Sequence, residues 1–193
     1  MKRPQPSARD RLVTSTVTLL SRQGYEATGV KQITVEASAP MGSFYFHFPG
    51  GKEELALAAL RQGADGVDML LRETLSAATS PEESLADCAL ALADVLKRSD
   101  WLDGCPVAAT ALESIGRSPT LREAAADAFE RWVTTIGDHL RTIGVADRQT
   151  RPLATTALAL LEGAEMIARV RADPEPLHDA AASLRVLARD ALR

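Results

Sequence analysis

The sequence predicts an all-α protein of about nine helices, in which a three-helix head is followed by a larger helical body. Apolar residues recur at spacings of three and four along nearly all of the 193 residues, and no run alternates with the two-residue period of a strand. Residues that begin and end helices divide this pattern into segments. Hydrophobic residues make up 46% of the chain, which is enough to bury a sizeable core. No run of about 18 apolar residues predicts a membrane span.

Caps and helix breakers mark the head and the long helix that follows it. Ser7 is placed to cap the first helix, and Gly24 is placed to end it. Thr28 is placed to cap the second helix. These signals predict helices over residues 8–24, 29–37, 40–46 and 52–77.

Proline after a polar residue marks later helix starts. Ser80-Pro81-Glu82-Glu83 has the form of a capping box with proline at the first helical position, and Ser118-Pro119 and Asp173-Pro174 repeat the cap and proline. Pro152 starts a further apolar stretch, and a short piece lies around residues 107–114. The chain has no internal repeat and no low-complexity linker, so we expect the head to continue into the body through the fourth helix.

Charge is divided unevenly along the chain. The net charge is −4, yet residues 1–52 carry seven Lys and Arg against three Asp and Glu, a net +4. Phosphate binding depends on local positive charge, so a basic head on an acidic body favours DNA binding by the head alone. Chance unevenness is the alternative.

The sequence lacks the features of secreted proteins and of common enzymes. Cys88 and Cys105 form no disulfide framework, and the polar, basic start has no apolar signal region, which together favour a cytoplasmic protein. The histidines, His47, His139 and His178, are scattered, and no HExxH, CxxC, nucleophile elbow or glycine-rich phosphate loop occurs. We expect no catalytic residue, no cofactor and no metal.

Residues 25–52, which read YEATGVKQITVEASAPMGSFYFHFPGGK, hold the most informative pattern. Five of the eight aromatic residues lie here: Tyr25, Phe44, Tyr45, Phe46 and Phe48. Two helices of about two turns are not stable alone, so they must pack on the first helix. A helix-turn-helix is built this way because its second helix must stand clear of the body to enter the major groove. The alternative is a hairpin whose rings are all core, but Tyr45 and Phe46 cannot both face inward with Phe44 and Phe48.

The same run resembles the DNA-binding region of the TetR family of transcriptional regulators. The resemblance covers about residues 9–57 and rests on Gly24-Tyr25, Thr28, Val30, Ile33, Gly42-Ser43-Phe44-Tyr45-Phe46-His47-Phe48 and Lys52-Glu53-Glu54-Leu55. The runs Ala39-Pro40-Met41-Gly42-Ser43 and Phe48-Pro49-Gly50-Gly51-Lys52-Glu53-Glu54-Leu55 are similar to the LmrA/YxaF-like subgroup. Gly104-Cys105-Pro106-Val107-Ala108-Ala109 is similar to the ligand domain of that subgroup.

The resemblance implies which side chains meet double-stranded DNA. Gly42 would let the recognition helix approach the sugar-phosphate surface closely. Polar or charged tips would contact phosphates, and four further residues would reach base edges. The phosphate contacts are Thr28, Lys31, Tyr45, His47 and Lys52, and the base-edge residues are Pro40, Met41, Ser43 and Phe46. Ser38 stands in the turn where the family usually has glycine, and we expect it to strain the turn or alter its angle.

The body carries residues suited to an apolar cavity for a small-molecule effector. Flat aromatic rings and adaptable methionines fit varied ligands. The expected ligand-binding residues are Met69, Trp101, Cys105, Phe129, Trp132 and Met166, for each of which ordinary core is the alternative. Glu113, Glu162 and Glu165 lie among apolar neighbours and can answer a polar group of the ligand or face solvent.

The last two helices, roughly residues 150–171 and 174–192, carry alanine-rich stripes. Small residues permit close helix packing, which favours a four-helix interface in a homodimer. The expected interface residues are Leu160, Leu161, Ile167, Leu184 and Leu187. One short recognition helix reads too few base pairs to be specific, whereas two heads can read a pseudo-palindrome.

Together these patterns predict a DNA-binding domain over residues 1–51 and a ligand-binding and dimerisation domain over residues 52–193. The function expected is that of a repressor released from its operator by a small, largely apolar effector. Gly63 and Gly66 interrupt the fourth helix, and we expect them to let it tilt when the effector binds. The alternatives are an activator of the same fold, or a helical small-molecule-binding protein or enzyme with no DNA role.

Overall fold

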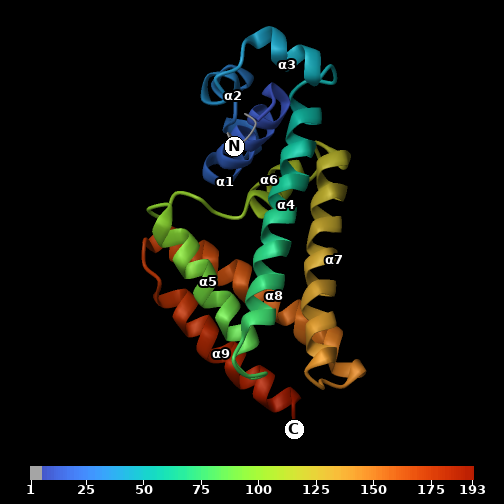
Figure 1. Ribbon diagram of the computed structural model, residues 1–193, viewed down its shortest axis with the longest axis vertical. Helices are drawn as coiled ribbons and strands as arrows, with labels where there is room; N and C mark the ends of the chain where they lie inside the picture. Colours follow the sequence, from blue (N-terminus) through green and yellow to red (C-terminus); the bar gives the residue numbers. More distant parts are fainter. Residues whose placement is uncertain (1–5) are drawn as a thin grey trace, which may run out of the picture. The chain divides into compact units, whose positions relative to one another are not determined.

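The structure, a computed structural model, describes residues 6–193 and is built from helices (Figure 1). Within those residues nine helices occur and no strand, so the predicted all-α class is confirmed. Over the same range no helix is long and apolar enough to cross a membrane. The helices are α1 (Ala8–Ala27), α2 (Val30–Glu36), α3 (Met41–His47), α4 (Lys52–Ala77), α5 (Ser84–Arg98), α6 (Pro106–Ser114), α7 (Pro119–Thr142), α8 (Asp147–Arg171) and α9 (Glu175–Ala191).

Side-chain caps confirm two of the predicted helix starts. Ser7 Oγ accepts the N–H of Asp10 at 3.1 Å, and the Asp10 carboxylate accepts the N–H of Ser7 at 3.3 Å, which makes a capping box at the start of α1. The Ser7 hydroxyl also donates to the Asp10 carboxylate, and this bond lowers the pKa of Asp10. At the start of α7, Ser118 Oγ accepts the N–H of Leu121 at 3.2 Å.

Two predicted caps are wrong, and in both cases the side chain has another partner. The N-cap of α2 is Gly29, because Thr28 Oγ1 instead donates to the Gly24 carbonyl at 2.6 Å. Helix α5 begins at Ser84 rather than directly after Ser80. The Glu83 carboxylate that a capping box would need is held by the Arg185 guanidinium, at 2.6 and 2.7 Å.

Two further helices differ from the prediction around glycine and proline. The regular path of α1 breaks at Gly24, as predicted, with a φ of 76°, but a last short turn continues to Ala27. Helix α8 begins at Asp147 rather than at Pro152, which lies inside the helix. A proline there removes one backbone hydrogen bond, and the helix continues through it.

The helices form two compact units. One contains the described residues up to Asp65 together with Cys105–Ala128, and in it α1 packs against α2, α3 and α6. The other contains Gly66–Gly104 and Phe129–Arg193, and in it α5, α8 and α9 pack side by side (Figure 1). Helices α4 and α7 contribute to both units. The functional boundary after residue 51 stays a prediction.

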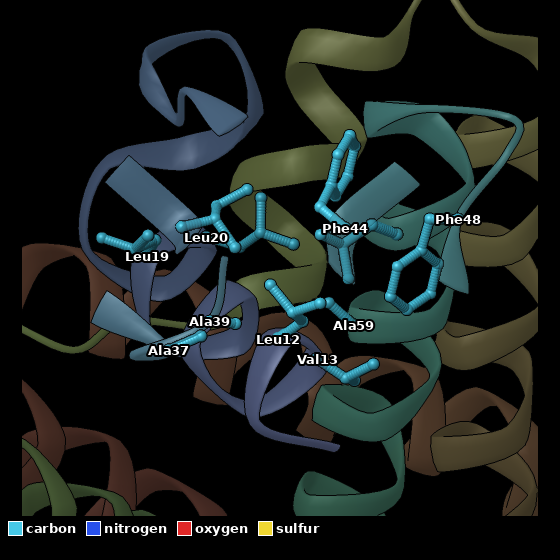
Figure 2. Close-up of a cluster of buried hydrophobic side chains, with 11 residues drawn as sticks. Leu12, Val13, Leu19, Leu20, Ala37, Ala39, Phe44, Phe48 and Ala59 are labelled. Atoms are coloured by element: carbon cyan, nitrogen blue, oxygen red, sulfur yellow. The ribbon is translucent and has the colours of Figure 1, made fainter. Parts of the chain in front are cut away.

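The core of the first unit is a cluster of buried apolar side chains from α1, α2, α3 and the start of α4 (Figure 2). Phe44 and Phe48 are each 1% exposed, and their ring centroids lie 6.3 Å apart. Burying a side chain of this size contributes about 1.5–3 kcal/mol, which is what two-turn helices lack by themselves. The cluster consists of Leu12, Val13, Leu19, Leu20, Ile33, Ala37, Ala39, Phe44, Phe48, Leu55 and Ala59.

Candidate nucleic-acid interface

The turn between α2 and α3 is closed by two backbone hydrogen bonds around Ser38. The N–H of Ser38 donates to the Val35 carbonyl at 3.0 Å, and the N–H of Ala39 donates to the Thr34 carbonyl at 2.9 Å. This is the Schellman arrangement, which requires a left-handed residue at Ser38. The φ of Ser38 is 47°, so serine adopts the conformation that glycine adopts at least cost. The sequence expectation of strain at this turn has its structural basis here.

Arg11 and Gln23 of α1 each form a hydrogen bond with α2 or the turn that follows it. Arg11 Nε donates to the Ala37 carbonyl at 3.0 Å, just before the turn, and Arg11 Nη1 donates to the Pro6 carbonyl at 2.9 Å. At the other end of α1, the side-chain amide of Gln23 donates to Gln32 Oε1 on α2 at 2.9 Å. Both ends of α1 therefore fix the position of α2.

Helix α3 turns one ring into the core and leaves two outside. Tyr45 is 62% exposed and Phe46 is 80% exposed, whereas Phe44 between α3 and α1 is buried. The Tyr45 ring lies edge-on to Phe44 with centroids 4.9 Å apart, and the Phe46 ring lies edge-on to His47 at the same distance. Tyr45 and Phe46 therefore present their rings to solvent, each beside the ring of a neighbouring residue of α3.

The residues expected at the DNA surface, with one exception, reach solvent. The exposed ones are Lys31, Pro40, Met41, Gly42, Tyr45 and Phe46, and the half-buried ones are Ser43, His47 and Lys52. The exception is Thr28, which is buried and bonded to the backbone of α1. The structure thus brings the remaining nine residues to the surface of α2, α3 and the start of α4.

Lys52 begins α4 beside Tyr25. Its Nζ lies 4.1 Å from the centroid of the Tyr25 ring, a cation–π contact. Burial lowers the pKa of Lys52, while burial together with Glu53 and Glu26 raises the pKa of Tyr25. The ring therefore holds the ammonium group at the surface of the head.

Glu113, near the end of α6, binds the backbone where α1 breaks. Its carboxylate accepts the N–H groups of Tyr25 and Glu26, the second at 3.0 Å. A Cβ at Gly24 would lie 2.5 Å from Glu113 Oε1, so glycine is needed there both for space and for its φ. Arg117 adds an ion pair to Glu26 at 2.9 Å. The end of α6 therefore fixes the backbone that leads into α2.

Helix α3 faces outward on a buried helical scaffold, as expected of a helix-turn-helix, and the sequence matches two family models. Residues 12–59 match the bacterial regulatory proteins of the tetR family, and residues 81–183 match the C-terminal domain of LmrA/YxaF-like transcriptional regulators. The chain belongs to the TetR family. The resemblance read from the sequence, including its subgroup, is confirmed.

Relatives and solved structures of the TetR family match about nine-tenths of the chain. The HTH-type transcriptional regulator LmrA of Bacillus subtilis is 30% identical over 88% of this chain and 90% of its own. The uncharacterized regulator YxaF of the same organism is 30% identical over 94% and 95%. A TetR regulator of Chloroflexus aurantiacus superimposes with a TM-score of 0.77 at 29% identity, covering 93% of this chain and 92% of that one. These proteins are transcriptional regulators, so this chain is one too, and not an enzyme.

Three of the residues expected to bind an effector in this TetR-family regulator are aromatic. Trp132 on α7 is fully buried and packs edge-on against Phe129, with ring centroids 5.4 Å apart. Trp101, in the turn after α5, is half-buried and has a left-handed φ of 63°. Trp132 therefore lies in the core of the second unit, and a role of this aromatic pair in effector binding stays a prediction.

The other three residues expected at that site lie near the surface. Met69 and Met166 are each about 60% exposed, and Cys105 is half-buried at the N-cap of α6, where its Sγ accepts a backbone N–H at 3.3 Å. The second unit also has an open groove of about 410 Å³ at the ends of α4 and α7, and none of the six residues lines it. Its lining is Leu75, Ser76, Ala78, Thr79, Ser80, Pro81, Ser84, His139, Thr142 and Ile143.

The five residues expected at a dimer interface also divide by exposure. Leu161 and Leu184 are buried within the protomer, between helices α5, α8 and α9 of the second unit. Leu160 and Leu187 are half-buried, and Ile167 is exposed. Three further apolar side chains of the same unit are also exposed, which are Met166 and Val170 on α8 and Val186 on α9.

Proposed function

We propose that this TetR-family regulator is a repressor that binds a pseudo-palindromic operator as a homodimer and leaves it when a small, largely apolar effector binds. The observation that carries the proposal is how α3 places its aromatic side chains. Its buried Phe44 anchors the helix, while its neighbours Tyr45 and Phe46 stand in solvent on a fixed scaffold. A short helix presented in this way fits the major groove. The regulator would act in the cytoplasm, where its DNA is.

The proposed DNA contacts follow from exposure and chemistry. Lys31, Tyr45, His47 and Lys52 would meet phosphates, because their polar or charged tips reach the surface of α2, α3 and the start of α4. Pro40, Met41, Ser43 and Phe46 would meet base edges, with Gly42 allowing close approach. Thr28 is left out of the proposed surface because it is buried.

A homodimer is supported by exposed apolar side chains on α8 and α9. Ile167 and Val170 lie three residues apart on α8, with Gly163 one turn before Ile167, and Val186 is exposed on α9. Nothing lies within 4 Å of the position of a Cβ on Gly163, so this stretch of α8 is open. Apolar surface of this kind favours burial against a second copy.

For release by an effector, we propose that the contacts at the end of α6 carry the change to the head. An effector beside the Phe129–Trp132 pair would favour one arrangement of the helices over another. Any displacement of α6 would move Glu113, and Glu113 holds the backbone of Tyr25 and Glu26. The position of α2 would change with it, and the head would lose its fit to the operator.

The test of the proposed function is selection of bound duplexes from random DNA by the purified protein, at two salt concentrations. We expect a pseudo-palindrome whose affinity falls by roughly 10³-fold or more between about 50 and 200 mM salt, since several phosphates are neutralised. Transcription in vitro from a promoter that carries the selected site separates repression from activation. Selection of no sequence at either salt would contradict the proposal.

A further inference from the structure

The recognition helix α3 carries none of the long polar side chains that read guanine or adenine by paired hydrogen bonds. Its seven residues, Met41–His47, include no Lys, Arg, Asn, Gln, Asp or Glu. Guanine is most often read by Arg or Lys and adenine by Asn or Gln. Hydrogen-bond readout by α3 is therefore limited to the hydroxyls of Ser43 and Tyr45 and the ring of His47.

The side of α3 that points away from the core carries the phenyl ring of Phe46 and the backbone of Gly42. Phe44 and Phe46 are two residues apart on a helix of 3.6 residues per turn, so they point to roughly opposite sides. Phe44 is buried, so Phe46 points outward. Gly42 lies one turn before Phe46, and nothing lies within 4 Å of the position of a Cβ there. The outward face of α3 therefore carries an apolar ring at Phe46 and no side chain at Gly42.

A second apolar side chain lies at the start of the helix, where recognition helices reach base edges. Met41 is 40% exposed and is the first residue of α3. The 5-methyl group of thymine is the one apolar feature in the major groove, and it is read by apolar contact. The apolar side chains of Met41 and Phe46 are therefore chemically suited to contact thymine methyl groups in the major groove.

We propose that this regulator reads its operator through thymine methyl groups, with Phe46 and Met41 as the specificity-determining side chains. The inference rests on the proposed function, because it concerns the DNA that the same surface binds. It predicts thymines at fixed places in each half-site. The Phe46 ring also lies edge-on to the His47 ring, with centroids 4.9 Å apart.

The test replaces thymines in the selected duplex by deoxyuridine, one position at a time. Deoxyuridine keeps every hydrogen-bonding group of thymine and removes only the methyl group. We expect the dissociation constant to rise about fourfold at one or more thymines of each half-site, the value for one buried methyl group. With the Phe46→Ala variant, deoxyuridine at the position that faces residue 46 should no longer change the dissociation constant.

The matched control is Leu112→Ala, which removes another apolar side chain that is 72% exposed, on α6. It should retain the full effect of deoxyuridine. Phe46 is exposed, so its variant should fold, and circular dichroism checks this. The measurements are made at about 50 mM salt, where DNA binding is stronger, so that the dissociation constant of a weakened variant can still be measured.

Three outcomes would count against these ideas in different ways. Wild-type affinity that is equal for thymine and deoxyuridine at every position overturns the thymine inference and leaves the repressor proposal standing. A Phe46→Ala variant that keeps every deoxyuridine effect overturns the role of Phe46. Failure to select any duplex contradicts the proposed function itself.

Discussion

At the scale of single residues, the turn of the helix-turn-helix is held in a conformation that its sequence does not favour. Ser38 has a φ of 47° and closes a Schellman arrangement. A left-handed conformation costs an L-residue roughly 1–2 kcal/mol, and glycine avoids this cost but gains entropy in the unfolded chain. We expect Ser38→Gly to raise the free energy of unfolding by about 0.5–1 kcal/mol, measured by urea denaturation.

Ser38→Ala is the control for this prediction, because alanine has the same backbone preference as serine without its hydroxyl. It should leave the free energy of unfolding close to that of the wild type. An equal gain for alanine and glycine would mean that the hydroxyl, and not the backbone, is the source of the strain.

Residues that act through local pattern could be predicted from the sequence, and residues that act through distant contacts could not. The Ser7 and Ser118 caps and the buried Phe44 follow from neighbours within one or two turns. Glu113 was expected to meet a ligand or solvent, yet it holds the N–H of Tyr25, 88 residues away. A carboxylate on a helix gives no local sign that its partner is a distant backbone.

At the scale of elements, α4 contains two glycines with opposite surroundings. A Cβ on Gly63 would lie 2.7 Å from Cγ of Pro106 on α6, whereas nothing lies within 4 Å of the position of a Cβ on Gly66. We expect Gly66→Ala to stabilise the protein by about 1 kcal/mol through helix propensity. Gly63→Ala should destabilise it by roughly 1–3 kcal/mol, because α6 must move.

Urea denaturation of the two single variants measures this difference. Equal effects would show that α6 does not pack on α4 at Gly63. The comparison also refines the tilt expected from the sequence. Gly66→Ala stiffens α4 without touching α6, so it is the variant that isolates bending of the helix from loss of packing.

The ends of the elements were harder to predict than the elements themselves, and the reason is competition for the capping side chain. Apolar spacing placed each of the nine helices within residues 6–193, since each buries one face. Glu83 was expected to cap α5, but Arg185 on α9, 102 residues further on, binds its carboxylate. The same competition removed Thr28 from both its expected cap and the DNA surface.

At the scale of the whole molecule, the proposed repressor depends on a second copy of the chain. One α3 contacts only a few base pairs, so specific binding needs two heads joined by an interface. The exposed apolar residues Met166, Ile167 and Val170 on α8 are the candidates for that interface, while Leu161 and Leu184 are occupied inside the protomer. Dimerisation and DNA affinity should therefore be lost together.

Val170→Glu tests this dependence, since Val170 is 82% exposed and the substitution should not disturb the protomer. In a dimer, the new carboxylate would be buried without a partner, which costs about 3 kcal/mol or more and weakens association at least a hundredfold. Sedimentation should then show a folded monomer, and operator affinity should fall at concentrations where the wild type binds. Leu112→Glu, which places the same charge at an exposed position on α6, should change neither property. A dimeric Val170→Glu protein would mean that the two copies meet on another face.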